Sequence, residues 1–449
     1  MKSTHCLCFT VLAFGVGACV NRVPIEGMPC PCADGYTCCD NQCLPGQACQ
    51  LDAGSTSDVA IESTTPVWTD AGQSRWQPIA SWSHSDWISL TTTSPPFVMG
   101  DRAAFRDVSP TGRAVTYRFA ENDWLEQEGH WPTDRDIVRV GLVWTGSQAV
   151  YWGGVASGGE FFGECNNRGG VYSPATDTWS AINTTGAPLL AVDGGGYTGK
   201  EVVLRGDSCV PQQSGSAVPG PVIGVLYDPA TDAWRSMSTV NAPTTAGGTD
   251  VVLGEKVVCW GGALYVAGQA FTGPLDQSSG LTNSGAVYNA ADDTWTAMST
   301  TNAPSPRFGV LALAMRGRMF VWGGTDGTTN SFGEQSYFRD GGIFDPETNT
   351  WTSISKDDSP ILTADNGLLW AEEQGLVYLW ASIWKPDVGW RGATLWTYDP
   401  SADQWASVDV TGLPEMLSTY FVWTGKDLLA IGMLAAEPTT IMGGFRYTP

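Results

Sequence analysis

Short apolar runs separated by turn residues recur in a fixed order along most of the chain. One run ends in a turn at Val143-Trp144-Thr145-Gly146, and a second run leads to the double glycine of Trp152-Gly153-Gly154. The same landmark returns at Trp260-Gly261-Gly262 and Trp322-Gly323-Gly324. A variable loop, a strand that ends in an aromatic residue, an Asp/Asn-rich turn and a Trp strand follow. Runs of β-forming residues bounded by turn chemistry predict four strands per unit.

The end of each unit has its own signature, an aromatic residue seven positions before a tryptophan. Tyr227 to Trp234 reads YDPATDAW, and Tyr398 to Trp405 reads YDPSADQW. The tryptophans of this signature follow one another at intervals of 54 to 61 residues: Trp124, Trp179, Trp234, Trp295, Trp351 and Trp405. Double glycine, aromatic residue and Trp at this period resemble kelch repeats, and the resemblance spans residues 73 to 449. It implies an all-β, kelch-type β-propeller of four-stranded blades, similar to the central domain of galactose oxidase.

The two chain ends predict how such a ring closes. Tyr447-Thr448-Pro449 matches Tyr227-Asp228-Pro229, so the chain stops where the other units turn toward their Trp strand. Trp76 has no preceding strands of its own and supplies the missing outer strand. Pairing the two ends removes the open sheet edges and gives seven blades. Six blades is the alternative, if the segment from Trp82 to Trp124 is irregular.

The N-terminus has the pattern of an export signal. Met1-Lys2 is followed by a short apolar stretch from Cys6 to Ala18, which is too short to span a bilayer as a helix. Val16-Gly17-Ala18-Cys19 resembles the lipobox of bacterial lipoproteins, which implies cleavage before Cys19 and its lipidation. Val20 after the cysteine then favours the outer membrane. An ordinary secreted protein, cut at a nearby A-x-A-like site, is the alternative.

Before the repeats, the chain divides into four segments. We expect a lipoprotein signal peptide at 1–18, a lipidated tether at 19–29, a Cys-rich module at 30–49 and an acidic flexible linker at 50–72. The module has little apolar core, so disulfides would have to hold it, with pairings that remain open. Its six cysteines are Cys30, Cys32, Cys38, Cys39, Cys43 and Cys49. A zinc knuckle is weaker, because no His and no pair of CxxC motifs is present.

Three cysteines lie among the repeats. Cys165 and Cys209 fall in corresponding loops of adjacent units, so we expect a disulfide between them. Cys259 stands beside Trp260 in an apolar strand, which predicts a buried and inert thiol.

Composition and charge limit the classes of molecule that the protein is expected to bind. With 54 glycines, 21 tryptophans and only 15% charged residues, the chain is neither disordered nor a coiled coil. A net charge of −23 argues against nucleic acid, which is bound through Lys and Arg, and is explained by solubility. We expect a protein or glycan partner, membrane attachment through the lipid only, and a monomer.

Function is expected where the units differ, and not in the tryptophans that recur once per blade, which we interpret as blade-to-blade packing. The loops after the double glycines have unequal lengths and share one face with the connections between blades. Candidate ligand contacts near these loops are Arg168, Arg307, Arg339, Arg391, Trp384 and Trp390. A set of arginines suits a carboxylate or an anionic sugar. The alternative is pairing with local acids such as Glu164, Glu334 and Asp340.

The sequence bears on three enzyme classes. A copper radical oxidase is poorly supported, because the chain has 3 His, of which only His84 and His130 lie beyond the signal and both fall outside the loops. The same two residues make a nucleophilic triad hard to build. A mutarotase similar to the kelch-type sialic acid mutarotases needs a carboxylate near an arginine, and Glu160, Glu164 and Glu334 are available. The sequence predicts a binding module without cofactor or metal. A purely structural envelope protein is a further alternative.

Overall fold

A computed structural model describes residues 36–39, 42–45, 75–84, 96–106, 114–127, 137–156, 164–211, 217–264, 280–329, 336–362, 366–385, 389–435 and 440–448. The chain divides into two compact units, Met1–Val67 and Trp68–Pro449. In the first, β1 (Tyr36–Cys39) and β2 (Gln42–Pro45) form an antiparallel hairpin. Within the described residues, no helix is long and apolar enough to cross a membrane.

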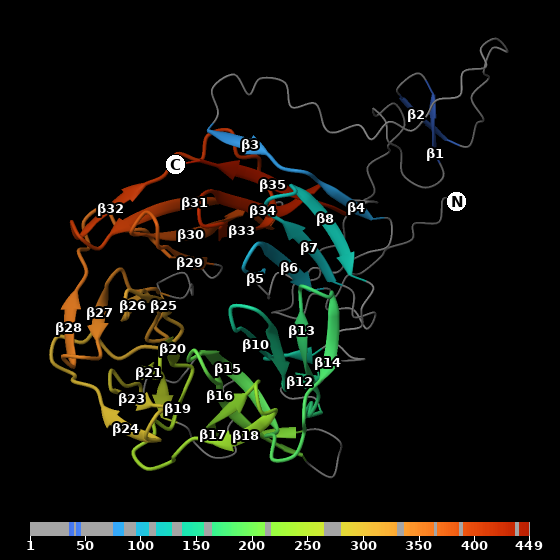
Figure 1. The fold of residues 1–449 in the computed structure, drawn as a ribbon. Helices are drawn as coiled ribbons and strands as arrows, with labels where there is room; N and C mark the ends of the chain where they lie inside the picture. The colour runs from blue at the N-terminus through green and yellow to red at the C-terminus, as the bar shows by residue number, and fades with distance from the viewer. Residues whose placement is uncertain are drawn as a thin grey trace, which may run out of the picture. The chain divides into compact units, whose positions relative to one another are not determined.

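The second unit is a ring of seven blades, which follow one another in chain order (Figure 1). In the first six blades the four strands pair antiparallel in chain order, and the short strands β12 and β22 interrupt that order in the second and fourth blades. The first three blades are β5 (Phe97–Met99), β6 (Arg102–Arg106), β7 (Ala114–Arg118) and β8 (Asp123–Gln127); β10 (Gly141–Trp144), β11 (Ala149–Trp152), β13 (Gly169–Ser173) and β14 (Thr178–Ala181); and β15 (Leu190–Tyr197), β16 (Val202–Pro211), β17 (Ala217–Asp228) and β18 (Ala233–Ser236). The next three are β20 (Thr249–Leu253), β21 (Lys256–Trp260), β23 (Gly285–Asn289) and β24 (Thr294–Ala297); β25 (Leu311–Met315), β26 (Arg318–Trp322), β27 (Gly341–Asp345) and β28 (Thr350–Ser353); and β29 (Asn366–Ala371), β30 (Leu376–Lys385), β31 (Gly389–Asp399) and β32 (Gln404–Ser407).

The first strand of each blade faces the centre of the ring, where successive first strands lie against one another (Figure 1). Antiparallel order places the second-to-third strand loops and the blade-to-blade connections on the same side, which we call the loop face. Two short sheets reinforce it. There β9 (Ile137–Val138) pairs with β12 (Val155–Ala156), and β19 (Thr245–Ala246) pairs with β22 (Ala263–Leu264).

The chain ends complete the seventh blade, as predicted. Its strands are β33 (Leu417–Trp423), β34 (Leu428–Ala435), β35 (Thr440–Tyr447) and the N-terminal β3 (Trp76–Pro78). Trp76 stands opposite Tyr447, and β4 (Trp82–His84) pairs farther along β35. The six-bladed alternative is wrong, because β5 to β8 form a complete sheet of their own.

The recurring tryptophans pack between blades. The Trp of each double-glycine landmark meets the Trp of the next blade's outer strand, with ring centroids 4.8 Å apart for Trp152 and Trp234. The same contact measures 5.3 Å for Trp260 and Trp351. It measures 4.6 Å for Trp322 and Trp405. Tilted aromatic pairs of this kind stabilise a junction beyond their buried area, which confirms the packing interpretation.

A hydrogen-bonded clasp explains the rest of the repeat signature. The hydroxyl of Tyr227 donates to Asp232 (2.8 Å), whose carboxylate also accepts the backbone N–H of Asn183 from the preceding blade (2.9 Å). The indole N–H of Trp234 donates to the Asn183 carbonyl (2.7 Å). Asp232 has a φ of 52°, the left-handed turn conformation that Asp and Asn tolerate best. Equivalent bonds recur at Tyr288, Asp293, Trp295 and Ser238, and at Tyr398, Asp403, Trp405 and Ser355.

The seventh blade departs from the clasp because its turn is split between the chain ends. Tyr447 accepts a hydrogen bond from Arg75 (3.0 Å) instead of donating to an Asp. The indole N–H of Trp76 still donates to a backbone carbonyl, that of Asp409 (3.1 Å), as the indole of Trp234 does in the third blade. The closing junction is therefore held by the N-terminal strand itself.

Candidate functional site

Two of the predicted arginines lie on the loop face with exposed side chains. Arg168 directly precedes β13 in the second blade. Arg339 precedes β27 in the fifth blade and donates to the Ser359 carbonyl (2.6 Å). The structure therefore places them in separate blades, three positions apart around the ring.

Arg307 has a structural position. Its side chain is fully buried, and its guanidinium donates to Asp340 (2.6 Å), to the carbonyl of Gly323 (2.9 Å) and to Ser305 (2.6 Å). It also lies 3.9 Å from the centre of the Phe338 ring. Arg307 is therefore paired with a local acid, as the alternative interpretation predicted, and it is not a candidate ligand contact.

The other three candidates lie in the long hairpin of the sixth blade. Trp384 stands opposite Trp390 in the register of β30 and β31, and Arg391 follows in β31. Their side chains lie outside the described part of the structure.

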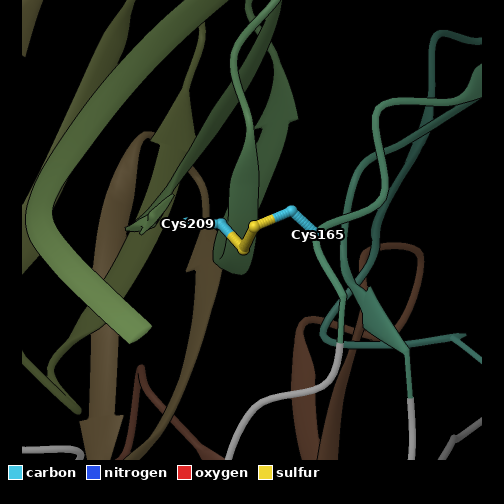
Figure 2. The surroundings of a disulfide bond; sticks show 2 residues. All are labelled: Cys165 and Cys209. Atoms are coloured by element: carbon cyan, nitrogen blue, oxygen red, sulfur yellow. A yellow bond between two sulfur atoms is a disulfide. The ribbon is translucent and has the colours of Figure 1, made fainter. Parts of the chain in front are cut away.

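The predicted disulfide between blades is present. Cys165 and Cys209 are bonded, with Cα atoms 5.9 Å apart, and tie the loop of the second blade to β16 of the third (Figure 2). Cys259 is a buried free thiol, and burial raises its pKa well above the usual value, so it stays protonated. In the N-terminal hairpin, Cys38 stands opposite Cys43. Cys39 lies in β1. Cys19, Cys30, Cys32 and Cys49 lie outside the described residues.

The third blade breaks the landmark that the second, fourth and fifth blades share. Where those blades have Trp-Gly-Gly, it has Arg205-Gly206-Asp207. The register confirms the equivalence, because Arg205 lies three residues after the partner of Tyr227, and Trp260 lies three residues after the partner of Tyr288. Arg205 lies 5.8 Å from the Trp295 ring, in the place of the usual tryptophan partner. A packing residue and a glycine have been replaced by two charges.

Arg139 is a second departure, one blade earlier. It has a φ of 53°, and the equivalent positions after β19 and after Phe308 hold Gly247 (66°) and Gly309 (61°). A left-handed conformation is uncommon for a residue with a side chain, and such strain concentrates at functional sites. The arginine side chain is therefore kept at a cost to the backbone.

These departures meet in one place, which we call the charged cluster: Arg139, Asp193, Arg205, Asp207 and Asp250. Arg139 bonds Asp193 through two of its nitrogens, one at 3.0 Å, and reaches Asp207 at 2.9 Å. Asp193 sits at a bulge in β15. Arg205 holds both carboxylate oxygens of Asp250, at 2.9 and 3.2 Å. The cluster lies at the loop-face end of the inner strands of the second, third and fourth blades.

Burial governs the electrostatics of the cluster. The side chains of Arg205, Asp207 and Asp250 are only 7%, 7% and 8% exposed. Burial raises the pKa of Asp193 to about 6; Arg139 opposes this shift, and the charges of Asp207 and Asp250 add to it. Burial would lower the pKa of Arg205, but Asp250 raises it above its usual value, so the arginine stays charged.

A small polar cavity opens beside the cluster between the third and fourth blades. Its walls include Asp193, Arg205, Thr249, Asp250 and Trp260, and its volume is about 10 Å³. That is room for one water-sized group. Within the described residues, no group of three or more His, Cys, Asp and Glu is arranged to hold a metal ion.

A larger hollow of about 440 Å³ lies on the opposite face, beside the turns of the third and fourth blades. Its arginine is already engaged. Arg235 donates twice to Glu201 at 2.7 Å, and also to Tyr288 (3.2 Å) and the Ala290 carbonyl (3.1 Å). We therefore place the candidate site on the loop face.

Sequence reasoning missed the charged cluster, although one signal for it was present. Arg205-Gly206-Asp207 is visible as a departure once the four landmarks are aligned. Arg139, Asp193 and Asp250 had no such signal, because only the bulge and the ring bring them together.

Comparison with known proteins agrees with the repeat. A family model described as Kelch motif matches residues 306–356, which span the fifth blade from its entry to just past its outer strand. No curated protein matches the chain significantly. Together with the ring of seven four-stranded blades, the motif match supports a kelch-repeat propeller.

Proposed function

We propose that the chain is an exported, lipid-anchored binding module of the bacterial envelope. Its propeller holds a glycan or an envelope protein on the loop face, as a monomer and without a cofactor. The kelch motif and the seven-bladed ring support a binding or interaction role. Val16-Gly17-Ala18-Cys19 supports the anchor and the location.

The observation that carries the proposal is the charged cluster. Charges that stand where the blades with the Trp-Gly-Gly landmark have a tryptophan and two glycines bring no packing gain, because buried charges are costly. The exchange occurs on the face where the loops are unequal, beside the interblade disulfide. Binding is the simplest use of such a departure.

Capture on a surface tests the binding proposal. Full-length protein in detergent is immobilised and exposed to peptidoglycan, lipopolysaccharide and purified envelope proteins. We expect one of them to be retained, and Arg168→Ala, Arg339→Ala and Arg391→Ala to weaken capture while leaving the melting temperature nearly unchanged. Trp384→Ala and Trp390→Ala follow as the first aromatic tests. If wild type retains none of these, the recognition proposal fails.

The anchor is tested separately. Cells expressing wild type or Cys19→Ser are labelled with radioactive palmitate and fractionated. We expect label and outer-membrane recovery for wild type, and neither for the variant. Equal membrane recovery of both proteins without label would contradict the anchor.

A mutarotase is the second candidate, favoured by one observation. Asp193 has a pKa of about 6 and contacts Arg139, which joins a carboxyl suited to proton transfer near neutral pH with a group that binds acidic sugars. The candidate predicts faster anomeric interconversion of an acidic sugar, followed by NMR. A rate equal to that in buffer excludes the activity for that sugar. If the capture assay retains no ligand and the NMR assay detects no catalysis, a purely structural role in the envelope is favoured.

A further inference from the structure

We infer that Cys38 and Cys43 form a disulfide that closes the N-terminal hairpin of β1 and β2. The inference goes beyond the proposed binding function, because it concerns the Cys-rich module at 30–49, whose pairings the sequence leaves open. The bond forms when the two thiols give up two protons and two electrons. An exchanging disulfide, either oxidised glutathione or the active-site disulfide of an oxidoreductase, accepts them and becomes two thiols.

The register of the hairpin places the two cysteines directly opposite each other. In β1 and β2, which lie side by side in Figure 1, Cys38 pairs with Cys43 and Cys39 pairs with Gln42. Only two residues separate the partners of the second pair in the sequence. In a hairpin with two connecting residues, the pair that flanks the connection exchanges backbone hydrogen bonds and the next pair does not. Cys38 and Cys43 therefore form a non-hydrogen-bonded pair.

Pro45 independently supports this type of pairing. Proline has no backbone N–H, so within a sheet it is confined to positions whose N–H would face away from the partner strand. Pro45 stands opposite Tyr36, two residues beyond Cys43, and pairs two positions apart are of the same hydrogen-bonding type. The Cα atoms of a non-hydrogen-bonded pair lie about 4.5 Å apart, and a disulfide needs about 4.4 to 6.8 Å. A pair of this type meets the requirement.

Strand alternation excludes the other cysteine of β1 as a partner of Cys43. Successive residues of a strand lie on opposite faces, so Cys38 and Cys43 share one face of the hairpin and Cys39 lies on the other. Cys43 is thus the cysteine of the two strands that both opposes Cys38 and shares its face. With this bond fixed, the fifteen pairings that six cysteines allow fall to three.

The composition of the hairpin gives the bond a structural role. A two-stranded hairpin by itself is marginally stable in water. The strands read YTCC and QCLP, and their largest apolar side chains, Tyr36 and Leu44, fall on opposite faces. Neither face therefore carries an apolar cluster. A covalent bond stabilises such a segment by restricting its unfolded chain, so we assign the disulfide the task of keeping the hairpin folded.

Disulfide mapping of the full-length protein tests the inference. The purified protein is incubated with oxidised and reduced glutathione, its remaining thiols are blocked with N-ethylmaleimide, and a protease that cleaves before aspartate is added. Cleavage before Asp40 separates β1 from β2. We expect tandem mass spectrometry to find Cys38 linked to Cys43, with the bond between Cys165 and Cys209 as the internal standard. Blocked thiols at both positions, or a link from either to another cysteine, overturn the inference.

Single substitutions show which sulfur loses its partner. In Cys38→Ser, Cys43 should change from unlabelled to labelled by N-ethylmaleimide, and in Cys43→Ser the same change should occur at Cys38. The matched control is Cys39→Ser, which changes the neighbouring cysteine on the opposite face and should leave Cys38 and Cys43 unlabelled. Label on any cysteine of the module other than Cys43 in the Cys38→Ser protein contradicts the assignment, and the wild-type map decides the matter if a variant misfolds.

The outcome is independent of the proposed function, because the bond is formed in purified protein. Absence of palmitate label at Cys19 would contradict the anchor and leave this pairing intact. A different partner for Cys38 would overturn the pairing alone and leave both the anchor and ligand capture on the loop face unaffected.

Discussion

Replacing Asp250 by alanine removes the one acidic side chain that forms an ion pair with the buried Arg205 among the described residues. Arg205 is 7% exposed and holds both oxygens of that carboxylate, at 2.9 and 3.2 Å. Arg205 also donates to the carbonyl of Pro243 (2.6 Å). Breaking one side of a buried pair costs roughly 3 to 5 kcal/mol of the free energy of unfolding, because the other charge is left in a poorly solvated site.

A double variant separates this cost from any packing defect. At the next junction Trp260 occupies the place of Arg205, and Ala312 occupies the place of Asp250. Arg205→Trp with Asp250→Ala copies that apolar junction and offers Trp295 the ring contact of the other blades. Replacing a buried ion pair by packed apolar groups is neutral or stabilising by about 1 to 4 kcal/mol. The double variant should therefore be at least as stable as wild type.

Urea unfolding followed by tryptophan fluorescence and circular dichroism measures the three proteins. The cycle closes with Arg205→Trp alone, which leaves Asp250 buried and unpaired and should be destabilised as well. The reasoning is refuted if Asp250→Ala costs less than about 1 kcal/mol, or if the double variant is as unstable as the single one.

Three further predictions concern closure, pH and the disulfide. Trp76→Ala should cost about 3 to 5 kcal/mol by removing the contact with Tyr447 (5.0 Å between rings), and an unchanged thermal melt would exclude closure through this strand. Because the pKa of Asp193 is raised to about 6 in the folded protein, its protonated carboxyl contributes to the free energy of unfolding fully below about pH 4. That contribution is lost as the pH rises through 6. The free energy of unfolding should fall by up to about 3 kcal/mol across that pH range, and the fall should be smaller than this limit because the side chain is 32% exposed. Asp193→Asn should flatten the dependence of the urea midpoint on pH. An identical slope in both proteins would refute the pKa shift. Cys165→Ser with Cys209→Ser opens a loop spanning a separation of 44 residues and should cost about 4 kcal/mol in the same assay, whereas a loss below 1 kcal/mol would show that the bond adds little.

The fold could be read from the sequence because repetition multiplies weak signals. A single Trp at a strand end says little, but the same Trp repeated at five similar intervals requires one packing role. The pairing of Trp76 with Tyr447 followed from the same logic, since the last unit lacks its outer strand and the strand of Trp76 has no unit of its own. The disulfide between Cys165 and Cys209 followed from their equivalent loops.

The charged cluster could not be read in the same way, because it depends on what differs between blades. Asp193 reaches Arg139 only because a bulge turns it out of the β15 register. Arg307 shows the opposite case, since an arginine expected to contact a ligand is fully buried against Asp340. Burial is decided by local packing in the fifth blade, which residue type does not reveal.

We propose that the loop face binds its ligand through the charged cluster of the second to fourth blades. Surface capture of peptidoglycan, lipopolysaccharide and purified envelope proteins is compared between the full-length wild type and the variant carrying Arg205→Trp and Asp250→Ala. We predict that the variant, as stable as wild type, retains at least tenfold less of whichever ligand wild type holds, because about 1.4 kcal/mol suffices for that change. Capture by the stable variant that equals capture by wild type would contradict the claim.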